Sequence, residues 1–306
     1  SVAKRPLFVF GGGAAHAAVA ARAVLRQTGA ASFTTYAGGG ITDPSDPLSF
    51  GSYLGRPESE GVVASADLVV AIGTELSECD LWRDKLGHTA PMVRVDVDPV
   101  SLSDAHRANV QIKADAQAFL TALAEAVSDL PAATGWSPDE VTAARARWKV
   151  EVDVARPHIV PVCDALRGAL PDDTMIYSDM TQFAYVGKEV WDMGTPGLWH
   201  HPTGFGTLGY ALPAAIGGAL ARRRKPTVVI SGDYGFQYTV QELGTAVELG
   251  LSLPILLWDN GKLKEIEDAM VESQIAPNAV VARNPDFLAL AMAFGAGAEE
   301  PGTLSE

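Results

Sequence analysis

Short apolar runs alternate with alanine-rich stretches along this chain, and that alternation limits the folds it can adopt more than any other feature. Six runs are apolar on both faces, as strands buried inside a parallel sheet are: Leu7–Phe10, Leu68–Ile72, Met92–Val97, Met175–Tyr177, Thr227–Ile230 and Pro254–Trp258. Five stretches have the composition of helices: Ala14–Gln27, Ala116–Ser128, Leu208–Arg224, Thr239–Leu249 and Pro285–Phe294. Strands and helices in this order predict an α/β fold, with mainly parallel sheets flanked by helices.

The length of 306 residues indicates about two domains. The least periodic stretch is 130–136, and the Ser137-Pro138 that follows it is typical of a helix start, with a Ser cap and Pro at the first helical position. Asn284-Pro285 has the same pattern. We therefore expect one domain over residues 1–130, a linker over 131–155 and a second domain over 156–306, each domain with its own sheet.

Composition argues against several classes of function. The chain carries 37 acidic and 23 basic residues, a net charge of −14, without a basic patch, so we expect no nucleic acid and no membrane as partner. The longest run of small apolar residues, 211–221, is shorter than the ~18 residues that a membrane span needs. Cys79 and Cys163 lie far apart, as in chains of a reducing compartment. With no signal-peptide pattern at its start, the chain is expected to be cytoplasmic.

The residues with the most specific chemistry follow two of the predicted strands. Asp233 comes after the strand Thr227–Ile230, and Asn260 comes 27 residues later, after the strand Pro254–Trp258. Because parallel strands open on the same edge of a sheet, one carboxylate and one amide oxygen would meet there. Either residue alone is more simply explained as a helix cap or a turn residue. Together they favour a site for a hard cation such as Mg²⁺, beside a phosphate group that Gly232 would allow to approach the backbone.

These segments resemble a known family. Gly232-Asp233 followed by Asn260 is similar to the cofactor motif of the thiamine diphosphate (ThDP) enzymes. Gly204–Gly217 resembles the segment that holds the aminopyrimidine of the cofactor, and Asp179–Gln182 resembles the turn that reaches its diphosphate. The N-terminal half resembles the central domain of the family in the segments Phe10–Gly13, Gly38–Ile41, Asp46–Leu48, Ala66–Leu68 and Val95–Pro99. The closest resemblance is to the acetolactate synthase-like 2-oxo acid enzymes, and within them to the 2-oxoarginine decarboxylase-like branch.

The resemblance implies roles for particular residues. Asp233, Asn260 and the backbone carbonyl of Lys262 would ligate Mg²⁺. Leu208 would be the bulky apolar residue that holds the cofactor in its bent form, although a core helix residue is the simpler explanation of Leu208 alone. The implied cofactor-binding residues are Thr181, Gln182, Gly206, Leu208, Gly232, Asp233, Tyr234, Gly235, Asn260 and Lys262. Three positions depart from the family pattern: Thr181 replaces Gly, Tyr234 replaces Gly or Ala, and Asp259 replaces Asn.

The resemblance further implies an enzyme that uses ThDP and Mg²⁺ to decarboxylate a small-molecule 2-oxo acid, as a decarboxylase or as a carboligase, in a homodimer or homotetramer. The activating Glu of the family lies on a pyrimidine-binding domain, which no segment of these 306 residues resembles. We therefore expect a fragment, truncated at the C-terminus as well, that is inactive alone. The alternative is a non-catalytic nucleotide-binding module with a vestigial ThDP site. The identity of the 2-oxo acid stays open.

Two further patterns suggest ligands only weakly. Gly11-Gly12-Gly13 after a strand invites a dinucleotide interpretation, but the Rossmann pattern needs Gly where His16 stands, which favours a tight turn instead. Some relatives hold FAD or ADP in this domain, so FAD is possible but not favoured. His200 and His201 are adjacent, so their side chains point apart, and we expect no metal there.

Overall fold

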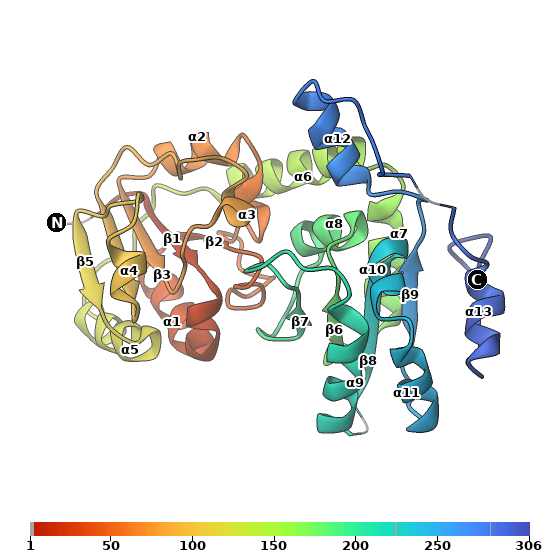
Figure 1. Ribbon diagram of the computed structural model, residues 1–306. Helices are drawn as coiled ribbons and strands as arrows, with labels where there is room; N and C mark the ends of the chain where they lie inside the picture. The colour runs from red at the N-terminus through yellow and green to blue at the C-terminus, as the bar shows by residue number, and fades with distance from the viewer. Residues whose placement is uncertain (1–2, 224, 282) are drawn as a thin grey trace. The chain divides into compact units, whose positions relative to one another are not determined.

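The computed structural model describes residues 3–223, 225–281 and 283–306, and it confirms the predicted α/β fold. The chain forms two compact units, which are described separately: Ser1–Ala155 with Lys188–Gly197, and Arg156–Gly187 with Leu198–Glu306. Each unit has its own sheet of parallel strands (Figure 1). In the described part of the chain, no helix combines the length and the apolar character that crossing a membrane would require.

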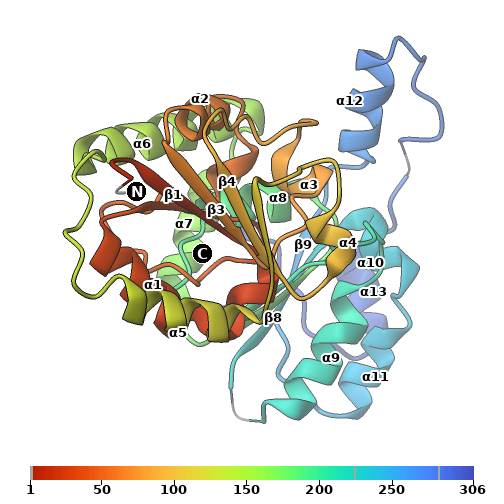
Figure 2. The same ribbon diagram turned by 90° about the vertical axis from the view of Figure 1, so that its left-hand side faces the viewer.

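The first unit has a five-stranded parallel sheet in the order β2-β1-β3-β4-β5. Its strands are β1 (Pro6–Phe10), β2 (Ala31–Thr34), β3 (Leu68–Ile72), β4 (Met92–Asp96) and β5 (Val110–Lys113). Its helices are η1 (Gly12–Ala17), α1 (Ala18–Thr28), η2 (Tyr53–Gly55), α2 (Ser59–Ala64), α3 (Glu78–Leu81), α4 (Pro99–Leu102), α5 (Ala116–Ala126) and α6 (Pro138–Ala155). Helices α1 and α5 lie side by side over one face of the sheet (Figure 2), where Val24 and Leu120 pack on Phe8, Phe10 and Ile72.

The segment 131–155, expected to be a linker, belongs to the first unit. Most of it is helix α6, which begins at Pro138 as predicted, with Ser137 Oγ accepting from the Asp139 N–H at 3.2 Å. The helix buries Trp148 completely, with its ring 6.0 Å from that of Phe33. Low periodicity before the helix suggested a linker, but burial of a large aromatic side chain on α6 ties the segment to the first sheet.

The second unit has a four-stranded parallel sheet in the order β7-β6-β8-β9. Its strands are β6 (Met175–Ser178), β7 (Trp199–His200), β8 (Thr227–Gly232) and β9 (Ile255–Trp258). Its helices are α7 (Ile159–Ala169), α8 (Gln182–Val190), α9 (Ala211–Ala221), α10 (Asp233–Tyr238), α11 (Glu242–Glu248), α12 (Lys264–Glu272) and α13 (Phe287–Ala293), although the last three residues of α8 are assigned to the first unit. The apolar core joins Leu212 and Ile216 of α9 to Val229 of β8, Phe236 of α10 and Leu243 of α11.

Three strands were not predicted, for three different reasons. Strand β2 is buried but contains Ser32 and Thr34, so it lacks an apolar run. Strand β5 is largely exposed at the sheet edge, and β7 has only two residues. Sheet neighbours rather than local sequence stabilise these strands.

Four predicted helix starts are wrong by a few residues. Helix α1 begins at Ala18, after η1, rather than at Ala14, and α11 begins at Glu242 rather than at Thr239. Helix α9 begins at Ala211 rather than at Leu208, and its predicted end at Arg224 lies outside the described residues. Helix α13 begins at Phe287 with Asp286 as its cap, because the Asp286 side chain accepts from the Ala289 N–H at 2.9 Å. Asn284, the predicted cap, binds two carboxylates instead.

Candidate functional site

The carboxyl ends of β6, β8 and β9 lie next to one another at one edge of the second sheet. Ser178 of β6 pairs with Ile230 of β8, and Gly232 of β8 pairs with Trp258 of β9. Figure 1 shows the three strands side by side. The register therefore brings the residues after β8 and β9, beginning with Asp233 and Asp259, to the same edge, where open α/β sheets bind ligands.

Asp233 is the first residue of α10 and is buried, with 3% of its surface exposed. The Nδ2 of Asn284 donates to Asp233 Oδ2 at 2.6 Å and to Asp259 Oδ1 at 2.7 Å. Burial raises the pKa of Asp233, the hydrogen bond from Asn284 opposes this shift, and the charge of Asp259 adds to it. The end of β8 thus holds a carboxylate whose negative charge would be stabilised by a nearby cation.

Asn260 and Lys262 lie in one turn directly after β9. Asn260 Oδ1 accepts from the Lys262 N–H at 3.2 Å, and Gly261 between them has a φ of +68°, which glycine adopts readily. Lys262 forms an isolated antiparallel bridge to Val281, which anchors the turn. In the described ranges, no three His, Cys, Asp or Glu side chains are grouped to hold a metal, so a cation here would need amide or backbone oxygens as well.

Asp179 organises the loop that precedes α9, a role that the sequence analysis missed. Its buried carboxylate accepts N–H groups of Gly209 at 3.2 Å, Tyr210 at 2.8 Å and Ala211 at 3.3 Å, and the hydroxyl of Ser231 at 3.0 Å. Burial raises the pKa of Asp179, and these hydrogen bonds oppose that shift. An Asp directly after an apolar strand was the available signal.

Leu208 lies in the loop before α9 rather than in the helix. Gly206 and Gly209 on either side of it have φ values of +65° and +83°. Leu208 is half-buried and is not part of the apolar core that α9 forms with β8. The simpler explanation of Leu208 as a core helix residue is therefore not supported.

Most of the remaining predicted residues lie near the ends of β6 and β8, and Gly206 lies in the loop before α9. Thr181 lies beside Gly232, because a Cβ on Gly232 would be 3.2 Å from Thr181 Oγ1. A Cβ on Gly235 would collide with the carboxylate of Asp179, which explains glycine at that position. Tyr234 is the second residue of α10 and is half-buried, whereas Gly206 is exposed.

Gln182 belongs to a polar network with Asn260, which was predicted as a site residue, and with Glu265 and Arg156, which were not. Its Nε2 donates to Glu265 Oε1 at 2.8 Å, and its Oε1 accepts from Asn260 Nδ2 at 3.3 Å. Arg156 donates to both oxygens of Glu265, at 3.0 Å and 2.8 Å. Burial alone would raise the pKa of Glu265, but hydrogen bonding and the charge of Arg156 outweigh it and lower that pKa.

In the first unit, the glycines of the predicted tight turn meet protein backbone. A Cβ on Gly11 would overlap the carbonyl oxygen of Gly73, and a Cβ on Gly13 would lie 3.0 Å from Gly73 Cα. The turn leads into η1 and then α1. Glycine at these positions therefore has a packing reason, the close approach of the segments that follow β1 and β3.

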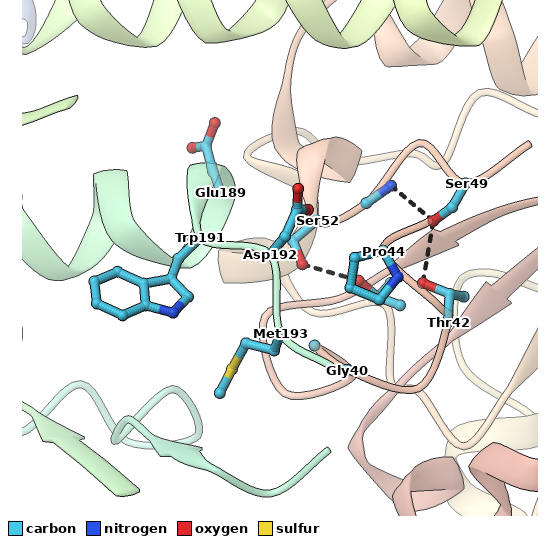
Figure 3. A pocket seen from close by; sticks show the side chains of 12 residues that line it. Gly40, Thr42, Pro44, Ser49, Ser52, Glu189, Trp191, Asp192 and Met193 are labelled. Atoms are coloured by element: carbon cyan, nitrogen blue, oxygen red, sulfur yellow. Dashed lines mark hydrogen bonds between the residues drawn. The ribbon is translucent and has the colours of Figure 1, made fainter. Parts of the chain in front are cut away.

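A small polar pocket lies elsewhere in the first unit (Figure 3). The hydroxyls that line it bond to each other, Thr34 to Ser52 at 2.8 Å and Thr42 to Ser49 at 3.1 Å. Its volume of about 20 Å³ is room for about one water molecule. This pocket is too small for a nucleotide.

The two adjacent histidines contact residues of β6. His201 Nδ1 lies 2.9 Å from Ser178 Oγ, and the His200 ring stacks on Tyr177 at 5.0 Å between centroids. Both contacts are of the kind that packs a sheet edge.

Two sequence models of one family match the chain. The model of the thiamine pyrophosphate enzyme central domain matches residues 1–123. The model of the thiamine pyrophosphate enzyme C-terminal TPP binding domain matches residues 179–305, where TPP is another name for ThDP. The second match contains the residues that follow β6, β8 and β9 at the sheet edge described above.

Curated proteins match over nearly all of the chain. It is 39% identical to the probable 2-ketoarginine decarboxylase AruI of Pseudomonas aeruginosa, over 100% of this chain and 55% of that protein. It is 28% identical to the acetolactate synthase large subunit of Parasynechococcus marenigrum, over 96% of this chain and 49% of that protein. It is also 28% identical to the acetolactate synthase isozyme 2 large subunit of Escherichia coli, over 96% of this chain and 54% of that protein. The chain spans about half the length of these relatives.

Proposed function

This chain belongs to the thiamine pyrophosphate enzymes, and we propose that it forms the diphosphate-binding half of an active site that decarboxylates a 2-oxo acid. The enzyme would be a ThDP- and Mg²⁺-dependent decarboxylase or an acetolactate synthase-like carboligase. One observation carries the proposal: the pairing of Gly232 with Trp258 brings Asp233 to the same sheet edge as the turn of Asn260, inside the match to the TPP binding domain.

The residues at this edge fit a magnesium ion. Asn284 Nδ2 lies within 2.7 Å of carboxylate oxygens from Asp233 and Asp259, so the site already stabilises an electropositive group there. Mg²⁺ prefers a few such oxygens and completes its shell with phosphate and water. Asp233, the side-chain oxygen of Asn260 and the backbone carbonyl of Lys262 would be the protein ligands. Asp259, in place of the usual Asn, adds negative charge beside them.

When bound, ThDP supplies the carbon nucleophile and the electron sink for the loss of CO₂. The residues that would line its diphosphate lie at the end of β8 or directly after β6 and β8, at the metal edge: Thr181, Gln182, Gly232, Tyr234 and Gly235. Gly206 and Leu208 would face the rings.

The loop of Leu208 is well suited to that position. Asp179 holds its end through three backbone N–H groups, so Leu208 is presented from a fixed backbone. The Leu208 side chain offers apolar surface and no competing hydrogen-bond donor, so it can press on a ligand without diverting its polar groups.

The names of the relatives support a substrate class. The similar proteins are named as a probable 2-ketoarginine decarboxylase and as acetolactate synthases, so a 2-oxo acid is the proposed substrate. We also propose a cytoplasmic homodimer or homotetramer. The first unit offers no argument of its own for FAD.

A non-catalytic nucleotide-binding module is the less favoured alternative. The presence of both Asp233 and Asn260, with the hydrogen bonds that hold them, argues against a vestigial site. The names of the relatives also favour an enzyme.

Calorimetry on the 306-residue chain tests the proposal. We expect ThDP to bind in the presence of Mg²⁺ and to lose most of its affinity in EDTA, because the metal links the diphosphate to Asp233 and Asn260. ADP is the comparison ligand. ADP binding that matches or exceeds ThDP binding would favour the nucleotide module, and ThDP binding that ignores EDTA would contradict the metal site.

A further inference from the structure

A chain of hydrogen bonds in the second unit connects the proposed metal ligand Asn260 to a partly buried ion pair. Asn260 Nδ2 donates to Gln182 Oε1 at 3.3 Å, and Gln182 Nε2 donates to Glu265 Oε1 at 2.8 Å. Arg156 Nε and Nη2 donate to the two oxygens of Glu265 at 3.0 Å and 2.8 Å. All four residues belong to the same compact unit.

The donors and acceptors in this series of hydrogen bonds can be arranged in only one way, because the series ends at the carboxylate of Glu265. An ionised carboxylate only accepts hydrogen bonds, so the NH₂ group of Gln182 must face Glu265. The carbonyl oxygen of Gln182 then faces Asn260, which must donate to it from its own NH₂ group. The side-chain oxygen of Asn260 consequently points away from Gln182, where it accepts from the Lys262 N–H at 3.2 Å.

The orientation matters because the two ends of an Asn amide differ chemically. The oxygen is a ligand for a hard cation, whereas the NH₂ group carries partial positive charge and would repel one. The amide could be turned over with little change in shape. The neighbours of Asn260 therefore decide which end it presents.

We propose that Glu265 and Arg156 are positioning residues that orient the Asn260 amide through Gln182, so that its oxygen faces the metal. The inference rests on the proposed function, because it takes Asn260 as a metal ligand. It also gives Gln182 a task beyond lining the diphosphate, since both ends of its side chain are engaged in this chain of hydrogen bonds.

Arg156 keeps Glu265 in the acceptor-only form. Its guanidinium binds the carboxylate through two parallel bonds, and 17% of the Arg156 side chain and 33% of the Glu265 side chain are exposed. The guanidinium also lies 5.7 Å from the ring of Tyr185, which helps to hold it in place. A protonated or amide side chain at position 265 could donate as well as accept, and the direction of the chain would no longer be set.

The test uses Glu265→Gln, which keeps the shape of the side chain but adds an NH₂ group. We expect it to weaken Mn²⁺ binding in the presence of ThDP by about 10- to 100-fold, the usual effect of losing a residue that orients a metal ligand. Electron paramagnetic resonance of free Mn²⁺ measures this directly, without turnover. Glu272→Gln, an exposed carboxylate on the same helix α12, is the matched control and should bind Mn²⁺ as the wild type does.

Repeating the experiment in an Asn260→Asp background distinguishes an orienting role of Glu265 from a structural one. Asn260→Asp presents an oxygen whichever way it turns, so Glu265→Gln should cost less than about threefold in that background. Equal losses in both backgrounds, or failure of Glu265→Gln to fold in either, would assign Glu265 a structural role and overturn the inference. Unchanged Mn²⁺ affinity in Glu265→Gln would overturn it too.

The Asn260 variants identify the other possible failure. If Asn260→Ala binds Mn²⁺ as the wild type does, or Asn260→Asp does not bind it, Asn260 is not an oxygen ligand and the proposed metal site itself is wrong. If Asn260→Ala loses affinity while Glu265→Gln does not, the metal site stands and only the orienting role fails.

Discussion

Asp233 joins the buried end of β8 to the proposed metal, so its removal should separate binding from folding. We expect Asp233→Ala to lose Mg²⁺-dependent ThDP binding by calorimetry. Its unfolding free energy without ligand should stay within about 1 kcal/mol of the wild type, because burial raises the pKa of Asp233 and keeping it charged is a cost to the folded state.

The exposed carboxylate of Asp172 provides the control, and Asp172→Ala should bind the cofactor normally. Retention of wild-type Mg²⁺-ThDP affinity in Asp233→Ala would contradict the ligand assignment. A large loss of stability in the same variant would indicate a structural carboxylate instead.

Leu208 and Leu212 are neighbouring leucines in very different surroundings. Leu212 is 1% exposed within the apolar core, whereas Leu208 is half-buried in the loop before α9. We expect Leu212→Ala to lose about 2–5 kcal/mol of unfolding free energy, as buried leucines do, and Leu208→Ala to lose about 1 kcal/mol or less. Urea denaturation measures both.

In an active enzyme that contains this chain, Leu208→Ala should lower kcat more than ThDP affinity. The metal and the diphosphate provide most of the binding, whereas Leu208 acts on the conformation of the bound cofactor. A parallel loss in both quantities would argue against the proposed role.

The carboxylate of Asp179 accepts hydrogen bonds both from the start of helix α9 and from Ser231 of strand β8. Asp179→Asn replaces one accepting oxygen with an NH₂ group, so at least one of its four donors is left without an acceptor. We expect a loss of about 1–3 kcal/mol in unfolding free energy at pH 7. Ser231→Ala, which removes only one donor, should cost less, and a smaller effect of Asp179→Asn than of Ser231→Ala would show that the cap of α9 does not depend on Asp179.

The end of α8 that belongs to the first unit contains a buried lysine. Burial lowers the pKa of Lys188 from 10.5 to about 7, and the charge of Asp80 opposes the shift. Between those pH values the unfolded chain binds a proton that the folded chain has lost, so the Lys188 contribution makes stability rise with pH. The slope is at most about 1.4 kcal/mol per pH unit.

Lys188→Met should remove this slope and raise the stability near pH 7. Urea denaturation at pH 7.5 and pH 9.5 compares the variant with the wild type, and the exposed Lys113→Met serves as control. A wild-type pH dependence in Lys188→Met would show that the lysine stays charged in the folded protein.

At the scale of the whole molecule, we expect cofactor binding without catalytic turnover. The 306 residues match the central and TPP binding domains, and the activating Glu of the family is expected on another domain. We therefore expect this chain by itself to bind Mg²⁺-ThDP weakly and to release no CO₂ from pyruvate or 2-oxoarginine. General acid–base catalysis, of the kind that this Glu would provide, typically raises a reaction rate about 10²- to 10⁴-fold. Sustained CO₂ release at ordinary enzyme rates would mean that the catalytic machinery lies within these residues.

Local sequence was sufficient for the elements whose own apolar residues stabilise them. Leu68–Ile72 was predicted with its observed bounds, and Asp233 and Asn260 were recognised as proposed metal ligands because a carboxylate and an amide each follow an apolar strand. Strand β2 was missed because Ser32 and Thr34 are buried by their neighbours rather than by their own character. The linker prediction left α6 outside the first domain for a related reason, since contacts of Trp148 with Phe33 and Phe50 tie the helix to the first unit.

The sequence by itself determined the α/β fold and which strand ends carry polar oxygens, because period, composition and turn residues are properties of short segments. Only the tertiary structure decided which groups meet across long separations. Asn284 lies 51 residues from Asp233 and Arg156 lies 109 residues from Glu265, and both contacts exist because packing of the second unit brings their segments together. The direction of a side-chain amide depends on the acceptor that it meets, and no local pattern records which acceptor that will be.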